Sequence, residues 1–264
     1  MKSMVRKQAE ALGIGLFLLW VFSGQGFAHD AWIQMEDYSI EKGAVAAFVP
    51  VNGHHFVIPS EELLSRDQVE KAFFLDPQGV EVPVVTKGEA GYQSKTGVAG
   101  QGTFLAVLKP QGGLFSKTPE GYQRGKSRKD LTDVVECKFS DKYAKAVFTV
   151  GQPGGEAFSR VLGHAAEIVP LQDPGMLKKG EELRVKVLFD GKPARTWVYG
   201  TFAGFSAEAN TFAYTTYTDV DGVAKIRLIE KGTWLLIVKQ ESAYPEASVC
   251  DKLVRGASLT FEIR

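Results

Sequence analysis

Four histidines are the residues of this sequence whose side chains most directly indicate a chemistry. They are His29, His54, His55 and His164. Imidazole nitrogen is a ligand that nickel, cobalt, copper and zinc accept, whereas calcium and magnesium prefer oxygen ligands. We predict that these histidines bind a divalent transition metal ion, at a site where His29, His164 and one member of the adjacent pair contribute three imidazoles.

His29 stands directly after a segment that has the three parts of a secretory leader. Three basic residues precede position 8, a mainly apolar run covers 11–22, and small residues lead to Ala28. Residues 1–28 are therefore predicted to be a signal peptide. Cleavage after Ala28 would make His29 the first residue of the mature chain, so that its α-amine and its imidazole could bind one metal ion together.

The leader also bears on where the protein acts. Its apolar run is about 12 residues long, whereas a helix that spans a membrane needs roughly 20. No cysteine lies near the cleavage site to carry a lipid. We expect a periplasmic or secreted protein that keeps no stable membrane anchor after cleavage.

His54 and His55 are adjacent, and they follow an Asn-Gly turn signal. If they lie on a strand, their side chains point to opposite faces, so only one of them can join a site with His29. The position of His55 next to Phe56 slightly favours His55. The alternative is that each histidine has an ordinary surface or hydrogen-bonding role.

The charge balance and the absent motifs exclude several functions. The chain has 31 Lys and Arg residues and 31 Asp and Glu residues, and removal of the leader leaves 28 basic and 30 acidic ones. Such a balance gives no electrostatic reason to expect nucleic acid or an anionic membrane as a partner. A Gly-rich phosphate loop, a zinc-type cysteine pair and a Gly-Xaa-Ser-Xaa-Gly elbow are all absent from the sequence.

The chain contains two cysteines, Cys137 and Cys250. An exported protein meets an oxidising environment, so one disulfide between them is expected. Two cysteines so far apart in sequence are also compatible with two unpaired thiols.

Short apolar runs between glycines and polar residues, without a helical stripe, predict an all-β protein. The strands predicted in the first half cover 31–35, 45–51, 71–75, 80–86, 103–108 and 143–150. A short helix is predicted over 61–69. The polar segment 110–142 is predicted to be a long loop, of the kind that is usually functional or mobile.

A second series of strand signals follows the Gly-rich segment 151–155, which is a plausible domain boundary. The strands predicted there cover 165–169, 183–189, 196–202, 212–218, 223–228, 234–239 and 257–263. Seven short strands in about 100 residues are typical of a β-sandwich of immunoglobulin or prealbumin type. We therefore predict two β-sandwich domains, an N-terminal one over 29–150 and a C-terminal one over 156–264.

Three tryptophans lie in strand-like contexts: Trp32, Trp197 and Trp234. Large aromatic side chains in such positions usually fill a core. All three are predicted to be core residues and not a platform for a ligand.

Several stretches of the mature chain resemble a known family. They are His29–Trp32, His164–Pro174, Leu177–Glu181, Val187–Pro193, Thr218–Gly222, Gly232–Leu236 and Ser258–Glu262. In these stretches the chain resembles the exported family of unknown function that is found beside bacterial nickel and cobalt uptake transporters. The segment 110–142 is the part that the resemblance covers least securely.

The resemblance implies a periplasmic β-sandwich protein associated with transition-metal uptake. It also implies one histidine at the mature start, one after a turn in the first domain, and one before the Glu-Ile-Val-Pro segment. Those positions are His29, His54 or His55, and His164 in this chain. Nickel or cobalt is the metal that the resemblance favours, and copper or zinc would fit the same nitrogen ligands.

Three functions remain open from the sequence. The first is a metal-binding accessory protein that captures nickel or cobalt without catalysis and passes it to a membrane transporter. The second is a copper-dependent oxidative enzyme that uses the amine and imidazole of His29. The third is a structural or adhesive β-sandwich module whose faces bind peptide or glycan.

Overall fold

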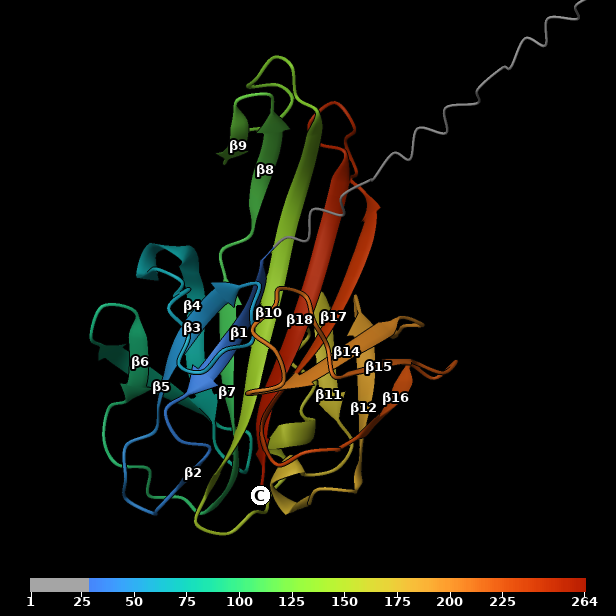
Figure 1. Ribbon diagram of the computed structural model, residues 1–264. Coiled ribbons are helices and arrows are strands. Elements are labelled where there is room, and N and C mark those ends of the chain that lie inside the picture. The colour runs from blue at the N-terminus through green and yellow to red at the C-terminus, as the bar shows by residue number, and fades with distance from the viewer. Residues whose placement is uncertain (1–28) are drawn as a thin grey trace, which may run out of the picture.

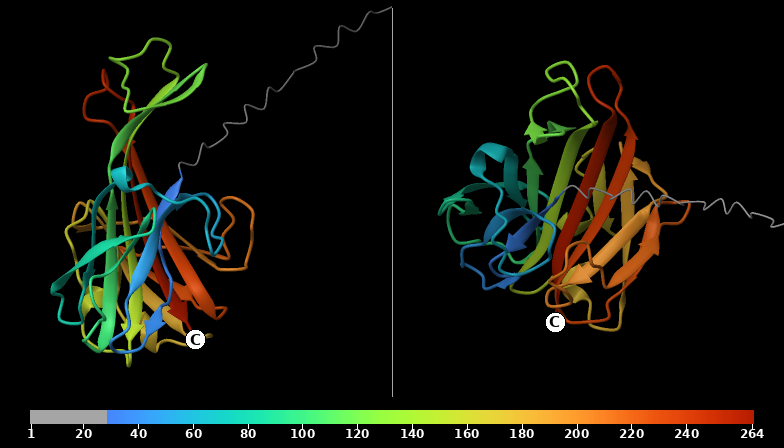
Figure 2. Two further views of the ribbon diagram at one scale, coloured as in Figure 1. Left: turned by 90° about the vertical axis from the view of Figure 1, so that its left-hand side faces the viewer. Right: turned by 45° about the horizontal axis from the view of Figure 1, so that its top comes forward.

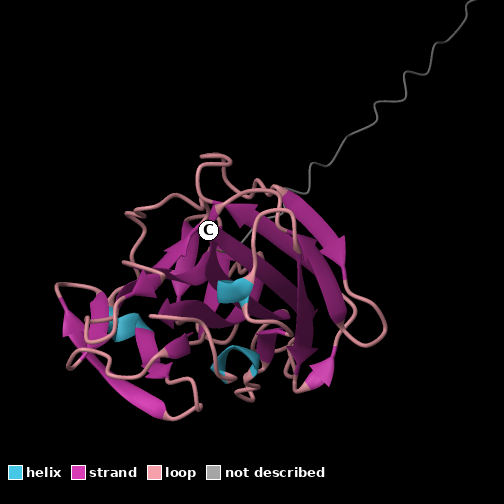
Figure 3. Ribbon diagram, turned by 90° about the horizontal axis from the view of Figure 1, so that it is seen from below, coloured by secondary structure: helices cyan, strands magenta, loops and turns pink. Residues whose placement is uncertain are grey.

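The computed structural model describes residues 29–264, and the predicted signal peptide over 1–28 lies outside the described residues. Almost all regular structure in the described part is β-strand (Figure 1). Helices there are limited to three single 3-10 turns, η1 (Arg66–Gln68), η2 (Ala157–Ser159) and η3 (Pro174–Met176), as the view from below shows (Figure 3). The predicted all-β class is confirmed. None of the described helices is long and apolar enough to cross a bilayer.

One large sheet contains strands from both halves of the described chain. Its strands follow the order β1 (Asp30–Met35), β3 (Ala47–Gly53), β6 (Gly91–Ser94), β5 (Glu81–Lys87), β4 (Val69–Leu75), β7 (Gly102–Pro110), β10 (Glu136–Val150), β18 (Lys252–Ile263), β17 (Gly232–Ala243), β14 (Trp197–Phe202) and β15 (Tyr214–Tyr217). Three short strands attach to it: β2 (Ser39–Ile40) and β8 (Gly113–Thr118), which pair with β10, and β9 (Gly121–Arg124), which pairs with β8.

A smaller sheet covers one face of the large one. It contains β11 (Ala166–Pro170), β12 (Glu182–Phe189), β13 (Lys192–Pro193) and β16 (Val223–Arg227). On the opposite face, the large sheet curls so that β1 lies against β10 and β18. The molecule therefore has a central layer of long strands with a core on each side (Figures 1 and 2).

The two faces of β10 show how the central layer is built. Tyr143 and Val147 pack into the core beneath the small sheet, whereas Ala146 and Phe148 pack into the core beneath β1. This alternation follows from the two-residue period of a strand. A strand that is buried on both faces has a nearly continuous apolar sequence, as β10 has near its end.

The structure differs from the predicted division into domains over 29–150 and 156–264. β10 belongs to the first range and pairs in parallel with β18 of the second. One core cluster contains Phe73 and Leu105 together with Leu183 and Trp234. Strands from both sides of the Gly-rich segment 151–155 thus belong to one continuous sheet. The physical reason is that β10 has two apolar faces, and each half of the chain covers one of them.

The segment 110–142 also differs from the predicted long loop. It contains the β8–β9 hairpin and the beginning of β10, and its longest stretch without a strand is 125–135. With the β17–β18 hairpin, these strands project from the body; we call the projection, residues 113–141 and 240–253, the arm (Figures 1 and 2). Because much of this ribbon is solvent-exposed, its sequence has no apolar alternation to reveal the strands.

The predicted helix over 61–69 is a third difference. Leu63 forms an isolated β-bridge with Val51, and the backbone N–H of Leu64 donates to Pro50 O at 2.9 Å. These bonds to β3 hold the segment extended until the short turn η1. Pairing with a neighbouring strand has overridden the local helical preference.

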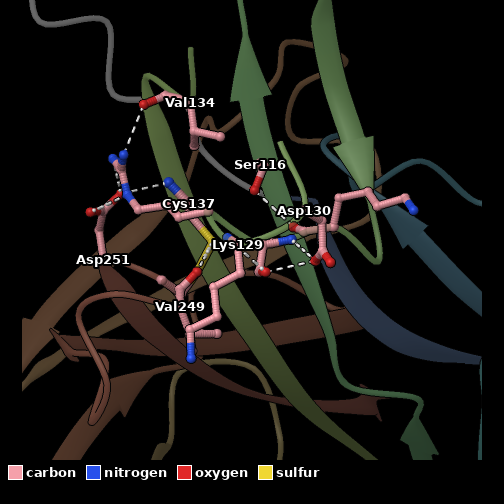
Figure 4. The surroundings of a disulfide bond; sticks show 11 residues. Ser116, Lys129, Asp130, Val134, Cys137, Val249 and Asp251 are labelled. Atoms are coloured by element: carbon pink, nitrogen blue, oxygen red, sulfur yellow. Dashed lines mark hydrogen bonds and ion pairs between the residues drawn. A yellow bond between two sulfur atoms is a disulfide. The ribbon is translucent and has the colours of Figure 1, made fainter. Parts of the chain in front are cut away.

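Cys137 and Cys250 form a disulfide inside the arm, which confirms that expectation (Figure 4). Around it, the Arg128 guanidinium donates to both carboxylate oxygens of Asp251 at 2.9 and 2.8 Å, and Asp251 accepts from the Cys137 N–H at 2.7 Å. The bond closes a loop of 113 residues. In the chain-entropy model, a loop of that length stabilises the folded state by about 5 kcal/mol.

The prediction that three tryptophans are core residues holds for two of them and is wrong for Trp197. Trp32 and Trp234 are buried, but Trp197 is 52% exposed. Trp197 starts β14 and pairs with Tyr217 of the edge strand β15, where the two rings meet edge to face at 5.0 Å. Trp197 is the first residue of β14 and lies beside the edge strand, where Tyr217 is also exposed, so the ring stays at the surface.

Candidate metal site

The register of β1 with β3 brings His29 and His54 together. Asp30 pairs with Gly53 in this antiparallel pair, so the residue before β1 and the residue after β3 are the next cross-strand neighbours. Cross-strand neighbours hold their side chains close on one face. The ring centroids of His29 and His54 are 4.0 Å apart, with 32° between the planes.

A carboxylate lies beside this histidine pair. Glu62 Oε2 accepts the backbone N–H of His54 at 3.1 Å, and Glu62 O accepts the N–H of Asn52 at 2.8 Å. Gly53 leaves the space for this approach, because a Cβ at Gly53 would collide with the Glu62 carboxylate. His54 Nδ1 is buried and has no hydrogen-bond partner within 29–264.

The pKa of His29 is lowered from its ordinary value. The first cause is partial burial of the ring, and the charges of His54 and Lys142 add to it, while Glu62 and Asp30 act in the opposite direction. A lowered pKa keeps the imidazole neutral at neutral pH. Neutral imidazole is the form that binds a metal ion.

His55 is directed elsewhere, although the sequence slightly favoured it over His54. Its Nδ1 lies 2.7 Å from the carbonyl oxygen of Ala207, in the loop before β15. The structure thus places His54 against His29 and gives His55 a backbone partner. This is the outcome expected for adjacent residues whose side chains diverge.

His164 lies on the other side of the central sheet. Its ring stacks on Tyr143, with centroids 4.6 Å apart, and Tyr143 belongs to the core beneath the small sheet. β1, which positions His29, packs on the opposite face, where Ser258 Oγ donates to Ala31 O at 2.7 Å. The structure therefore does not unite His164 with the histidine pair. No cluster of three or more His, Cys, Asp or Glu side chains suited to a metal ion occurs among residues 29–264.

His164 adjoins a buried ion pair instead. Lys145 Nζ lies 2.5 Å from Glu167 Oε1, and both side chains are almost completely buried. Glu167 also accepts the backbone N–H groups of Leu162 and Gly163 at 2.9 and 3.0 Å. These contacts fix the segment that carries His164 against β10. They make His164 part of the packing between the sheets.

The pKa of His164 is lowered to about 4, first by burial and then by the nearby charge of Lys145. The unfolded chain would bind a proton near its ordinary value of about 6.5, whereas the folded protein binds it only near 4. The stability contributed by neutral His164 is therefore complete above pH 6.5 and is lost as the pH falls towards 4.

We expect His164→Phe, which keeps a ring on Tyr143, to remove part of this acid sensitivity. The wild-type protein should lose about 1 to 2 kcal/mol more than the variant between pH 7 and 4.5, after allowance for the partial exposure of His164. Urea unfolding at several pH values measures the difference. Parallel stability curves for the two proteins would contradict the assignment.

Two further residues of the site carry no signal in the sequence. Glu62 lies in the segment predicted as helix, and Lys142 ends the segment predicted as a loop. Both are brought near the histidine pair by the end of β3. Glu62 bonds to the backbone of Asn52 and His54, and Lys142 donates to the Asn52 side chain. Nothing in the spacing of these residues could have indicated their proximity.

The fold and the site define an all-β protein with layered sheets and a partly exposed pair of histidines at one strand end. The chain belongs to the family described as Domain of unknown function (DUF4198), whose model matches residues 26–242. That description assigns no activity and no metal. None of the curated proteins matches the chain.

The chain has a detectable likeness to several solved structures. The D0-D1 domain of intimin is 13% identical, with 88% of this chain and 97% of that chain covered and a TM-score of 0.20. The adhesin InvE of Yersinia pseudotuberculosis is 13% identical, with 89% and 59% covered and a TM-score of 0.21. Trypsin-activated alpha-2-macroglobulin from Escherichia coli is 10% identical, with 90% and 16% covered and a TM-score of 0.25. Likenesses at these TM-scores carry no argument about function.

Proposed function

We propose that this protein is an exported accessory protein that binds a divalent transition metal ion, with nickel or cobalt favoured, at His29 and His54. The observation that carries the proposal is the contact of these two imidazole rings across the β1–β3 register. Both rings are at or near the surface, and His54 Nδ1 has no other partner within the described chain. Nitrogen ligands of this kind suit nickel, cobalt, copper and zinc.

Each residue has a distinct part in such a site. His54 would contribute one imidazole, and His29 would contribute a second imidazole together with its α-amine once the leader is removed. His29 is exposed, and its ring would turn from its tilted position against His54 so that a ring nitrogen faces the ion. Glu62 would hold the backbone of His54 and add negative charge beside the cation.

Such a site suits capture and release more than turnover. Three nitrogen ligands from one surface leave positions for water or for a ligand from a second protein. A membrane transporter that offers further ligands could then take over the ion. This arrangement supports the role of an accessory protein that delivers a metal and does not alter a substrate.

The test compares two purified chains, one that begins at His29 and one that carries a single extra glycine before it. The extra residue moves the amine away but leaves both imidazoles. We expect the first chain to bind one nickel, cobalt, copper or zinc ion, and the second to bind it about tenfold more weakly or worse, by calorimetric titration. Mass analysis of the exported protein establishes where the mature chain begins.

Two results would contradict the proposal in different ways. Equal affinity of the two chains would remove the amine from the site. Absence of binding by both at micromolar concentrations would make the structural or adhesive module the better account.

Copper binds nitrogen sites more tightly than nickel or cobalt, so affinity alone does not identify the natural metal. Peroxide consumption by the copper-loaded protein would instead support the oxidative enzyme.

A further inference from the structure

A small pocket lies beside the histidine pair, where the arm meets the body. Its volume is about 70 Å³, and it is bounded by Asn52, Leu64, Phe115 and Arg124 with two residues of β10, Ser140 and Lys142. Asn52 precedes the Gly53-His54 segment, so the pocket and the histidine pair share one end of β3. The volume is sufficient for a few water molecules or for one small oxyanion group.

The polar groups of β10 point into this pocket from one face. Ser140 and Lys142 are two residues apart on the strand, so their side chains lie on the same side. Ser140 is 5% exposed, and its Oγ has no hydrogen-bond partner among residues 29–264. A buried hydroxyl without a partner is uncommon, because it loses its hydrogen bonds to water without replacement.

Lys142, whose side chain is partly buried, supplies an ammonium group on the same face of β10 as that hydroxyl. It donates a hydrogen bond to Asn52 Oδ1 at 2.8 Å. An ammonium group has three N–H donors, so this bond leaves donors for an acceptor in the pocket. Arg124 of β9 brings a guanidinium to the rim, and it lies 5.7 Å from the Phe115 ring centroid.

We propose that this pocket binds the carboxylate or phosphate group of a small anionic ligand. An ammonium, a hydroxyl and a guanidinium are the donors that recognise such an oxyanion. The residues that line the pocket include no Asp or Glu. The unpartnered Ser140 hydroxyl is explained if its natural acceptor or donor is the ligand.

The charges around Lys142 support this assignment. Burial lowers the pKa of Lys142 to about 8, and the cations Lys239, Lys138 and Arg124 lower it further, while Asp30 raises it. Asp30 is itself paired with Lys239 at 2.9 Å. A bound anion would stabilise protonated Lys142, so binding should be strongest below pH 8 and should weaken as the pH rises through that value.

The pocket also affects the histidine pair, a consequence that rests on the proposed metal-binding function. Lys142 opposes positive charge on His29. It would oppose a metal ion there for the same reason, and a bound anion would reduce that repulsion. Anion and metal should therefore increase each other's affinity by one common factor.

The experiment titrates the metal-free, mature protein with inorganic phosphate and, separately, with malonate at pH 7, followed by calorimetry or by NMR. We expect binding that Lys142→Met weakens at least tenfold, Ser140→Ala about threefold, and Arg124→Gln a few-fold. Affinity for the tighter ligand should fall between pH 7 and 9. The tighter of the two ligands identifies the oxyanion as phosphate or carboxylate.

Lys192→Met is the matched control, because it removes a lysine from β13 on the small sheet. It should leave anion affinity unchanged within twofold, which excludes an effect of net charge. Thermal unfolding verifies that Lys142→Met is folded, and Arg124→Gln tests the exposed rim independently of folding. The absence of binding at millimolar phosphate and malonate, or binding that neither variant changes, would overturn the proposal. His29→Ala should retain anion binding, so failure of the metal site and failure of the pocket are separable.

Discussion

Replacing His54 with alanine in the chain that begins at His29 should weaken transition-metal binding on the order of 100-fold, which corresponds to about 2.7 kcal/mol. The reason is that His54 provides one of two imidazoles that the β1–β3 register places together. Its buried Nδ1 has no hydrogen-bond partner among residues 29–264. Calorimetric titration with nickel, and with zinc as a metal without redox chemistry, measures the loss.

His55→Ala and His164→Ala are the matched controls for this prediction. His55 is bonded to the carbonyl of Ala207, and His164 stacks on Tyr143 across the central sheet. Neither replacement should change metal affinity by more than about threefold. A loss on His164→Ala as large as that on His54→Ala would instead restore the three-histidine site that the sequence predicts.

Replacing Glu167 with alanine should destabilise the protein by about 3 to 5 kcal/mol. The replacement leaves the Lys145 ammonium buried without its carboxylate. It also removes the acceptor of the Leu162 and Gly163 N–H groups. Urea or thermal unfolding at neutral pH measures the change in free energy.

The double replacement Lys145→Met with Glu167→Leu separates the cost of an unpaired charge from the value of the pair. Apolar residues of similar volume should recover much of the loss, because neither charge then needs solvation. Removal of the exposed pair Lys179 and Glu230 is the surface control and should cost less than about 1 kcal/mol. A loss below about 1 kcal/mol for Glu167→Ala would contradict the role given to this pair.

The strands that are apolar on a buried face were predictable from the sequence. β12 and the end of β18 have this pattern, and the structure contains strands close to the predicted ranges 183–189 and 257–263. The β8–β9 ribbon was missed because it is partly solvent-exposed on both sides. The alternation of apolar and polar residues in a sequence reflects burial of one face, so a strand without a buried face shows no alternation.

The division of the chain into domains could not be read from local pattern. A Gly-rich segment such as 151–155 indicates a break in regular structure, but not whether the flanking strands belong to one sheet. That depends on the parallel pairing of β10 with β18, whose residues are more than 100 positions apart. Such pairing is a property of the assembled layers.

The sequence by itself determined that the chain is all-β, where most of its strands lie, and that its imidazoles are limited to four histidines. It also identified the two cysteines that form the disulfide. Only the tertiary structure decided that His54 meets His29, that His55 turns to Ala207, and that His164 is packed on the other face. The physical reason is that strand register and choice of face are fixed by the burial of whole sheets, so residues such as Glu62 and Lys142 come together without any local signal.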